Sequence, residues 1–134
     1  MNLISRDTDY AIRALLFISM QRDKIISTAE LENEIKLPRP FTRKIFQKLT
    51  KGGILKSIKG NKGGFALNKK PEEIFLQDII LLFQGKVEFS SCLFKKKVCP
   101  STKSCALRKE IKEIEEYAIR KLKNISLEYL IKAF

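Results

Sequence analysis

The chain has 134 residues, with 27 Lys or Arg, 15 Asp or Glu, three Cys and no His, which gives a net charge of +12. This length suits one domain of ordinary size. The lack of His excludes Ser-His and Cys-His catalytic pairs and imidazole metal ligands, and no pair of catalytic carboxylates is visible, so we expect no enzyme. The surplus of positive charge predicts an anionic partner, with nucleic acid or a membrane surface as the first candidates.

The apolar runs of the chain are short. The two longest, residues 14–18 and 79–83, fall far short of the ~20 apolar residues of a membrane helix. The N-terminal run also lacks the charge pattern of a signal peptide. We therefore expect a cytoplasmic protein without a membrane partner, in which an odd number of Cys argues against a disulfide framework.

The first two predicted helices are amphipathic. Residues 7–21 carry one apolar stripe at helical spacing. Its members are Ala11, Ala14, Leu15 and Ile18. Residues 27–36 begin with a capping box, in which Ser27 and Glu30 each satisfy a backbone N–H of the first turn.

A third helix is predicted from about residue 40 to residue 51, where Gly52 and Gly53 end it. Its expected apolar face consists of Phe41, Ile45, Phe46 and Leu49. Its expected outer face, with the residue that precedes the helix, consists of Arg39, Thr42, Arg43, Gln47 and Lys48.

Two short strands, 54–58 and 65–67, are expected next, joined by a glycine-rich hairpin tip that carries Lys59 and Lys62. Three helices followed by a hairpin is the order of a winged helix-turn-helix, whose recognition helix enters the major groove of DNA. The charge fits this arrangement, because residues 39–70 hold ten Lys or Arg and no Asp or Glu. The simpler alternative is a solvated lysine-rich face. We predict that the outer face of the third helix and the two hairpin lysines bind double-stranded DNA.

In the second half of the chain, the sequence predicts a helix over 76–83 and an irregular segment over 86–103. A long helix over 104–123 and a short last helix over 127–133 are expected to follow. The long helix has a nearly heptad-spaced apolar seam. Its members are Leu107, Ile111, Ile114, Ala118 and Leu122. The predicted fold is mainly α with a small β-hairpin. It has a winged helix-turn-helix domain, 1–85, and a second part, 86–134, with a cysteine-bearing loop and the long helix.

The three cysteines, Cys92, Cys99 and Cys105, have the spacing C-x6-C-x5-C. The absence of C-x-x-C argues against a zinc ribbon and against a thioredoxin-like motif. Thiolates are the usual ligands of iron–sulfur clusters, which normally need four protein ligands, so this set is one short. The alternative is three unrelated thiols in a loop and at a helix start.

The chain resembles the Rrf2 family of bacterial transcription regulators over nearly its whole length. The resemblance rests on Thr8-Asp9-Tyr10-Ala11-Ile12-Arg13-Ala14-Leu15 and on residues 45–49 leading into 53–57. The hairpin, residues 59–67, is its most specific segment, and residues 71–80, the three cysteines and the long helix follow as in the family.

The resemblance implies a homodimeric DNA-binding repressor in which the long helix pairs with its mate and the first helix also lies at the interface. It implies that Cys92, Cys99 and Cys105 bind a [4Fe–4S] or [2Fe–2S] cluster, which senses nitric oxide, redox state or iron–sulfur status and thereby controls DNA affinity. Related proteins supply a His three residues after the third Cys, where this chain has Arg108. Others supply an Asp from the partner's first helix, a position that Asp9 matches, with Asp7 as a nearby competitor.

Two alternatives stay open. One is a cluster-free regulator of the same family that responds to a small ligand or a protein partner. The other is an iron–sulfur protein that transfers electrons, in which the basic window steers an acidic partner.

Overall fold

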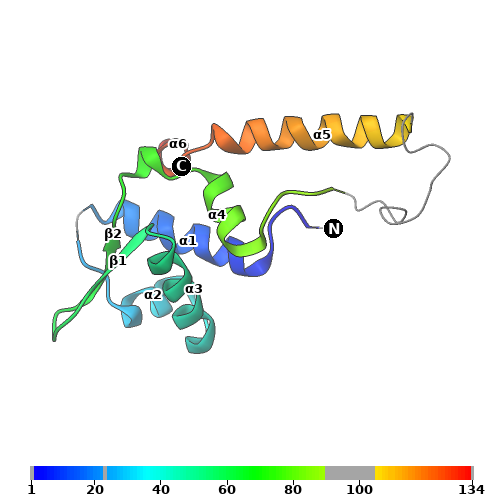
Figure 1. The fold of residues 1–134 in the computed structure, drawn as a ribbon. Coiled ribbons are helices and arrows are strands. Elements are labelled where there is room, and N and C mark those ends of the chain that lie inside the picture. Colours follow the sequence, from blue (N-terminus) through cyan, green and yellow to red (C-terminus); the bar gives the residue numbers. More distant parts are fainter. Residues whose placement is uncertain (1, 23, 90–104, 134) are drawn as a thin grey trace.

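The computed structural model describes residues 2–22, 24–89 and 105–133. The elements, in chain order, are α1 (Arg6–Met20), α2 (Thr28–Ile35), α3 (Arg39–Lys51), β1 (Leu55–Ile58), β2 (Gly64–Leu67), η1 (Pro71–Glu73), α4 (Leu76–Gln84), α5 (Ala106–Lys123) and α6 (Leu127–Lys132). Figure 1 shows α2 and α3 on one side of α1, with α4 and α6 on the other. The mainly helical fold with one small hairpin is confirmed.

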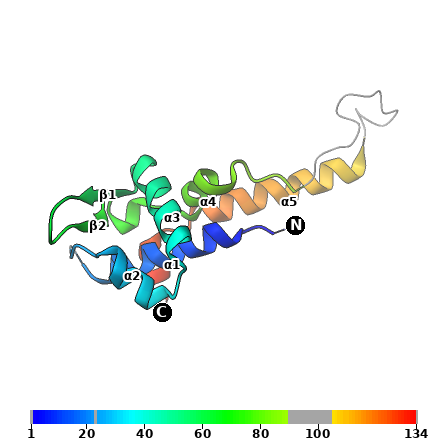
Figure 2. The same cartoon turned by 90° about the horizontal axis from the view of Figure 1, so that it is seen from below.

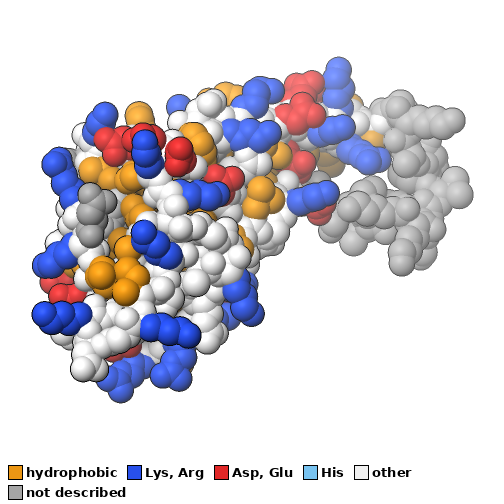
Figure 3. Space-filling view, turned by 60° about the vertical axis from the view of Figure 1, so that its left-hand side comes forward, with side chains coloured by type: hydrophobic (Ala, Val, Ile, Leu, Met, Phe, Trp, Pro, Cys, Tyr) orange, Lys and Arg blue, Asp and Glu red, His pale blue; other side chains and the backbone are white. Residues whose placement is uncertain are grey.

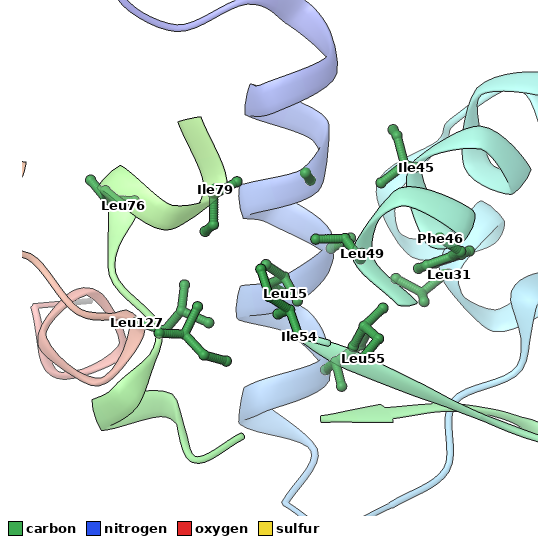
Figure 4. Close-up of a cluster of buried hydrophobic side chains, with 14 of the residues drawn as sticks. Leu15, Leu31, Ile45, Phe46, Leu49, Ile54, Leu55, Leu76, Ile79 and Leu127 are labelled. Carbon is green, nitrogen blue, oxygen red and sulfur yellow. The ribbon is translucent and has the colours of Figure 1, made fainter. Parts of the chain in front are cut away.

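Helix α1 forms the centre of the molecule. Ser5 caps it by accepting a hydrogen bond from the backbone N–H of Thr8. All four members of its predicted apolar stripe are buried. Figure 4 shows Leu15 of this helix in the middle of a cluster to which α3, β1, α4 and α6 each contribute side chains. One hydrophobic core therefore holds the described elements together.

Helices α2 and α3 form the helix-turn-helix pair. The capping box is present as predicted: the N–H of Glu30 donates to the Ser27 hydroxyl, and the Ser27 N–H donates to the Glu30 carboxylate. Lys36 ends α2 in the left-handed conformation, with φ of 54°. Buried Leu37 follows it, which holds the turn between the two helices against the core.

Strands β1 and β2 form an antiparallel hairpin, the wing. Leu55 faces Leu67 and Ser57 faces Phe65. The base of the wing is fixed to the chain before α2, because Ile26 and Phe65 exchange two backbone hydrogen bonds of 2.9 and 2.8 Å. A Cβ at Gly64 would collide with the Ile26 carbonyl, so only glycine allows this close approach.

The C-terminal elements share the core of the N-terminal ones. Leu76 donates its N–H to Ile125 and Leu127 donates to Ile74, both at 2.9 Å. Leu127 is fully buried. The predicted division at residue 85 therefore does not separate two hydrophobic cores.

Leu122 corrects a prediction. The heptad spacing places it in the dimer seam, but its side chain is only 6% exposed and packs in the core of its own chain. The reason is that the last turn of α5 lies against α4, whereas the first turns extend away from the core, as Figures 1 and 2 show. At mid-helix, Glu115 accepts a hydrogen bond from the N–H of Phe89.

No helix in the described part of the chain is long and apolar enough to cross a membrane.

Candidate nucleic-acid interface

The buried face of α3 differs by one residue from the sequence prediction. Thr42, predicted on the DNA-facing side, is only 1% exposed, and Phe41, predicted in the core, is 37% exposed. The buried stripe of α3 runs through Thr42, Ile45, Phe46 and Leu49. Thr42 fits there because its hydroxyl donates to the Pro38 carbonyl oxygen at 3.3 Å, which satisfies the polar group locally. Thr42 is therefore not on the outer face.

The outer face of α3 borders a groove of about 1330 Å³ between α2, α3 and the wing. Arg43 and Gln47 are exposed and lie one turn apart along it, and Arg39 lies at its start. Lys51, one further turn along, also lines the groove. Lys51 is not among the predicted DNA-binding residues, although its spacing of four from Gln47 places it on the same helix face.

The wing is fixed against α3 by an aromatic contact. The rings of Phe46 on α3 and Phe65 on β2 stack with centroids 4.5 Å apart and an angle of 19° between their planes. Both rings line the groove, which Ser57 also borders from β1. Stacked rings of this kind hold their elements in a defined relation. The distance between α3 and the wing is thus set by packing in the free protein.

Two of the basic residues predicted to bind DNA, Arg39 and Lys48, interact with other side chains of the protein. Arg39 directs its Nε to Glu32 at 3.4 Å, while its side chain stays 85% exposed. Lys48 places its ammonium 5.3 Å above the ring of Phe83, a cation–π contact with α4. A further basic residue of the window, Lys44, forms an ion pair of 3.2 Å with Asp7 on α1. Arg43, Gln47 and Lys51 are thus the exposed polar side chains of α3 in the groove that have no partner among the described residues.

Lys59 and Lys62 are both exposed near the tip of the wing. The turn is closed by the N–H of Gly63, which donates to the carbonyl of Gly60 at 2.9 Å. Gly60 has a φ of +116°, which L side chains rarely adopt. This tight turn places two cations at the end of a narrow projection, a shape suited to the grooves of a duplex.

The predicted cluster ligands are described only in part. Cys92 and Cys99 lie outside the described residues. Cys105 is the N-cap residue of α5. Asp9 is partly exposed on α1, and its carboxylate lies 2.9 Å from Arg13. Within residues 2–22, 24–89 and 105–133, no three Cys, Asp or Glu side chains lie close enough together to bind one metal ion.

The predicted dimer seam is partly exposed. Leu107 and Ile114 are 71% and 52% exposed, and Tyr117 beside them is 63% exposed. Ile111 and Ala118 are of intermediate exposure. Apart from Leu122, the seam therefore lies on a part of α5 that extends away from the core.

Comparison with known proteins agrees with this geometry. The family model Rrf2, described as an iron-dependent transcriptional regulator, matches residues 4–133. A predicted HTH-type transcriptional regulator of Aquifex aeolicus (strain VF5) is 36% identical over 97 residues, which cover 72% of this chain and 67% of that protein. The HTH-type transcriptional regulator NsrR of Shouchella clausii (strain KSM-K16) is 26% identical over 125 residues, 86% of this chain and 84% of that one.

The solved structure of CymR, the global cysteine regulator of B. subtilis, has a TM-score of 0.85 at 22% identity and covers 100% of this chain and 99% of its own. The structure of T. potens IscR has a TM-score of 0.70 at 24% identity, with 98% and 88% covered. These likenesses establish the winged-helix fold. The family match extends over almost the whole chain, and its members regulate transcription rather than catalyse reactions. The chain belongs to the Rrf2 family of DNA-binding transcriptional regulators.

Proposed function

We propose that the chain is a homodimeric repressor that reads an operator with the groove between α3 and the wing, and whose DNA affinity depends on an iron–sulfur cluster. The observation that carries the proposal is the groove itself. Arg43 and Gln47 project from the exposed face of a helix-turn-helix, with Arg39 at its start and Lys51 at its end. Arg and Gln can bond bidentately to base edges, whereas Lys mostly contacts phosphates.

The proposed homodimer rests on the outer turns of α5. Exposed Leu107, Ile114 and Tyr117 lie on a helix that only its last turn anchors in the core. Pairing with a second copy would remove this apolar surface from water, at about 25 cal/mol per Å². The heptad-like spacing suits such a helix pair.

Two of the proposed cluster ligands, Cys105 and Asp9, are among the described residues, and the position of Cys105 suits a thiolate ligand. Cys105 begins α5, and its side chain makes no capping hydrogen bond to the first turn. A helix N-terminus stabilises an anion, so it is a suitable place for a metal-bound thiolate. Cys92, Cys99 and Cys105 would hold the cluster, with Asp9 of the partner subunit as fourth ligand. When bound, such a group supplies iron and sulfide that react with nitric oxide or oxidants.

The chain offers a direct route from this site to the DNA-binding surface. Cys105 starts α5, and Leu122 at the other end of that helix packs into the same core as Leu49 of α3. Because closely packed cores switch between discrete arrangements, a change in the position of the Cys105 end can alter the presentation of α3. The two recognition helices of a dimer would then no longer match half-sites that lie one or more helical turns apart.

Anaerobic purification with iron and sulfide assays tests the cluster, and binding of the same protein to a duplex selected by it from a random pool tests the regulator. We expect the purified protein to contain both iron and acid-labile sulfide and to absorb visible light. We also expect the forms with and without the cluster to differ in their affinity for the selected duplex. Asp9→Asn is expected to weaken cluster retention, whereas Asp78→Asn is a charge-matched control on α4.

Absence of iron with sequence-specific binding intact would leave the regulator and remove the cluster, in favour of a cluster-free member of the family. Iron with weak binding to all sequences would instead favour electron transfer. Cys99→Ser separates these outcomes further, because retention of full iron and sulfide in this variant would contradict the proposed ligand set.

A further inference from the structure

The wing has a second basic face that the groove does not use. Residues paired across β1 and β2 share a face, so Ser57 and Phe65 line the groove while Lys56 and Ala66 point to the opposite side. There, Lys56 and Ala66 line a second hollow, of about 890 Å³. It lies between the back of the wing, the end of α1 and the start of α6.

This hollow collects cations from three separate segments. They are Arg22 and Lys24 after α1, Lys56 on β1, and Lys69 and Lys70 after β2. None of these five forms an ion pair with another residue that the structure describes. Figure 3, in which the left-hand side of Figure 1 comes forward, shows Lys and Arg side chains around hydrophobic ones on this side of the molecule.

The described lining of the hollow is predominantly positive. Two carboxylates follow it in the chain, Glu72 and Glu73, and Glu73 accepts a hydrogen bond from the Lys70 N–H at 3.2 Å. The acidic residue among its described lining is Glu128, which already pairs with Lys132 at 3.4 Å. Asp23, between Arg22 and Lys24 in the sequence, lies outside the described residues. Five cations of like sign raise the local potential, which favours a polyanion at this surface.

The lining favours an extended anion over a small ligand. Its buried polar side chain, Ser19, donates its hydroxyl to the Leu15 carbonyl at 2.6 Å and so has no free donor to orient a ligand. The charges stand on long side chains at the surface, and lysine ammoniums act as point charges for phosphates. A small-molecule site would instead need converging, fixed polar groups.

We propose that this hollow, behind the wing, binds the sugar–phosphate backbone of the duplex that flanks the operator. The proposal rests on the proposed DNA-binding function. It follows from continuity of charge, because Lys56 stands three residues before Lys59 near the wing tip. Three strand residues span ~10 Å, about three base pairs along a duplex. A sugar–phosphate backbone that contacts Lys59 at the wing tip can therefore also contact Lys56 at the hollow, about three base pairs further along the duplex.

The test compares two duplexes and two triple variants of the full chain. The first duplex is the selected operator alone, and the second extends it at both ends by about one helical turn, ten base pairs. The first variant is Lys56→Gln, Lys69→Gln and Lys70→Gln. The control variant is Lys109→Gln, Lys112→Gln and Lys123→Gln, which removes the same charge from exposed positions on α5.

We expect the unmodified protein to bind the longer duplex ~10-fold more tightly, with a steeper salt dependence. The wing variant should lose this gain, and the slope of log K against log salt should fall by about 0.9 for each lost phosphate contact. The control variant should keep it. Thermal melts of both variants confirm that the fold is intact.

Equal affinity of the unmodified protein for both duplexes would overturn the inference, as would equal losses in the two variants. If no sequence is selected, the proposed function fails, and the same comparison on random-sequence duplexes still decides whether the wing lysines contact DNA. Competition by inorganic phosphate or by polyglutamate at the hollow, without any effect of duplex length, would also overturn it, in favour of a small anion or an acidic protein.

Discussion

Glu32 and Arg39 form an ion pair that joins α2 to the first turn of α3, with 3.4 Å between Oε2 and Nε. The terminal Nη groups of Arg39 donate to no other residue that the structure describes. The carboxylate therefore holds the guanidinium by one edge and leaves its two outer nitrogens exposed beside the groove. First-turn residues of a recognition helix commonly contact base edges.

Glu32→Gln removes a negative charge from the groove, which alone would strengthen binding to any duplex. We expect the ratio of specific to non-specific affinity to fall instead, by ~3-fold, because Arg39 is no longer held for base readout. Fluorescence anisotropy on the selected operator and on a random duplex measures this ratio. Glu34→Gln, an exposed change on the same helix, is the control, and an equal ratio in both variants would contradict the role of Glu32.

Arg43 and Lys51 should behave differently although both line the groove. Arg43→Ala is expected to weaken specific binding by about 10-fold or more, because a bidentate base contact contributes ~1–3 kcal/mol. Lys51→Ala should weaken binding to all sequences alike and reduce the salt slope by about 0.9. Titrations at several salt concentrations measure both. Equal losses of specific and non-specific binding in Arg43→Ala would refute base readout by that residue.

Burial separates Thr42 from Gln47. Thr42→Val removes a hydroxyl that bonds to the Pro38 carbonyl inside the protein, so we expect a loss of ~1 kcal/mol in the free energy of unfolding. DNA affinity of the folded protein should not change. Gln47→Ala should show the opposite pattern, with weaker specific binding at unchanged stability. Urea denaturation and anisotropy on the same samples check both, and a selective loss of operator binding in Thr42→Val would restore it as a DNA contact.

The two ends of the α5 seam should also differ. Ile114→Asp places a charge on an exposed position, so we expect it to shift the protein towards monomer in sedimentation while the fold stays intact. Leu122→Ala instead leaves a cavity in the core and should cost ~2–5 kcal/mol of unfolding free energy. A dimer that survives Ile114→Asp unchanged would exclude this face of α5 from the interface.

Glycine is favoured for two different reasons at Gly64 in the wing and at Gly53 between α3 and β1. Gly64→Ala should disrupt the contact between Ile26 and Phe65, because the new Cβ would meet the Ile26 backbone, and we expect a loss of ~1–3 kcal/mol. Gly53 has open space around it but a φ of +74°, so Gly53→Ala should cost only about 1 kcal/mol of conformational strain. Thermal denaturation compares them, and equal small losses would contradict the close approach at Gly64.

Local patterns in the sequence predicted most of the fold. The capping box at Ser27 and the apolar spacing of α1 depend on residues close together in the chain, and both appear as expected. The exchange of Phe41 and Thr42 has a different origin. Hydrophobicity favours Phe in the core, but the phase of α3 is set by its packing on α1, and a helical Thr can satisfy its own hydroxyl.

The candidate site was predictable in its charge but not in its geometry. The ten cations of residues 39–70 form one run in the sequence, yet the structure divides eight of them between the groove, the wing tip and the back of the wing. Lys44 pairs with Asp7, 37 positions away in the sequence, and Lys48 makes a cation–π contact with Phe83, 35 positions away. Such partners depend on tertiary contacts, which no local pattern contains. Leu122 also depends on a tertiary contact. Heptad spacing identifies it as apolar but does not show whether its partner is a second copy of α5 or the core of its own chain.

Helix α5 packs into the hydrophobic core at one end only, and at mid-helix Glu115 accepts a hydrogen bond from the Phe89 N–H at 3.1 Å. Its 18 residues span ~27 Å from Cys105 to the turn that contains Leu122. A rigid rod whose core contacts lie at one end acts as a lever, so a tilt of about 5° at the core corresponds to a displacement of ~2 Å at the cysteine end of a rod of this length. The helix thus converts a movement of atomic size at one end into a small rotation at the other. A stiff helix of this length can therefore transmit a small movement over ~27 Å without any change of secondary structure.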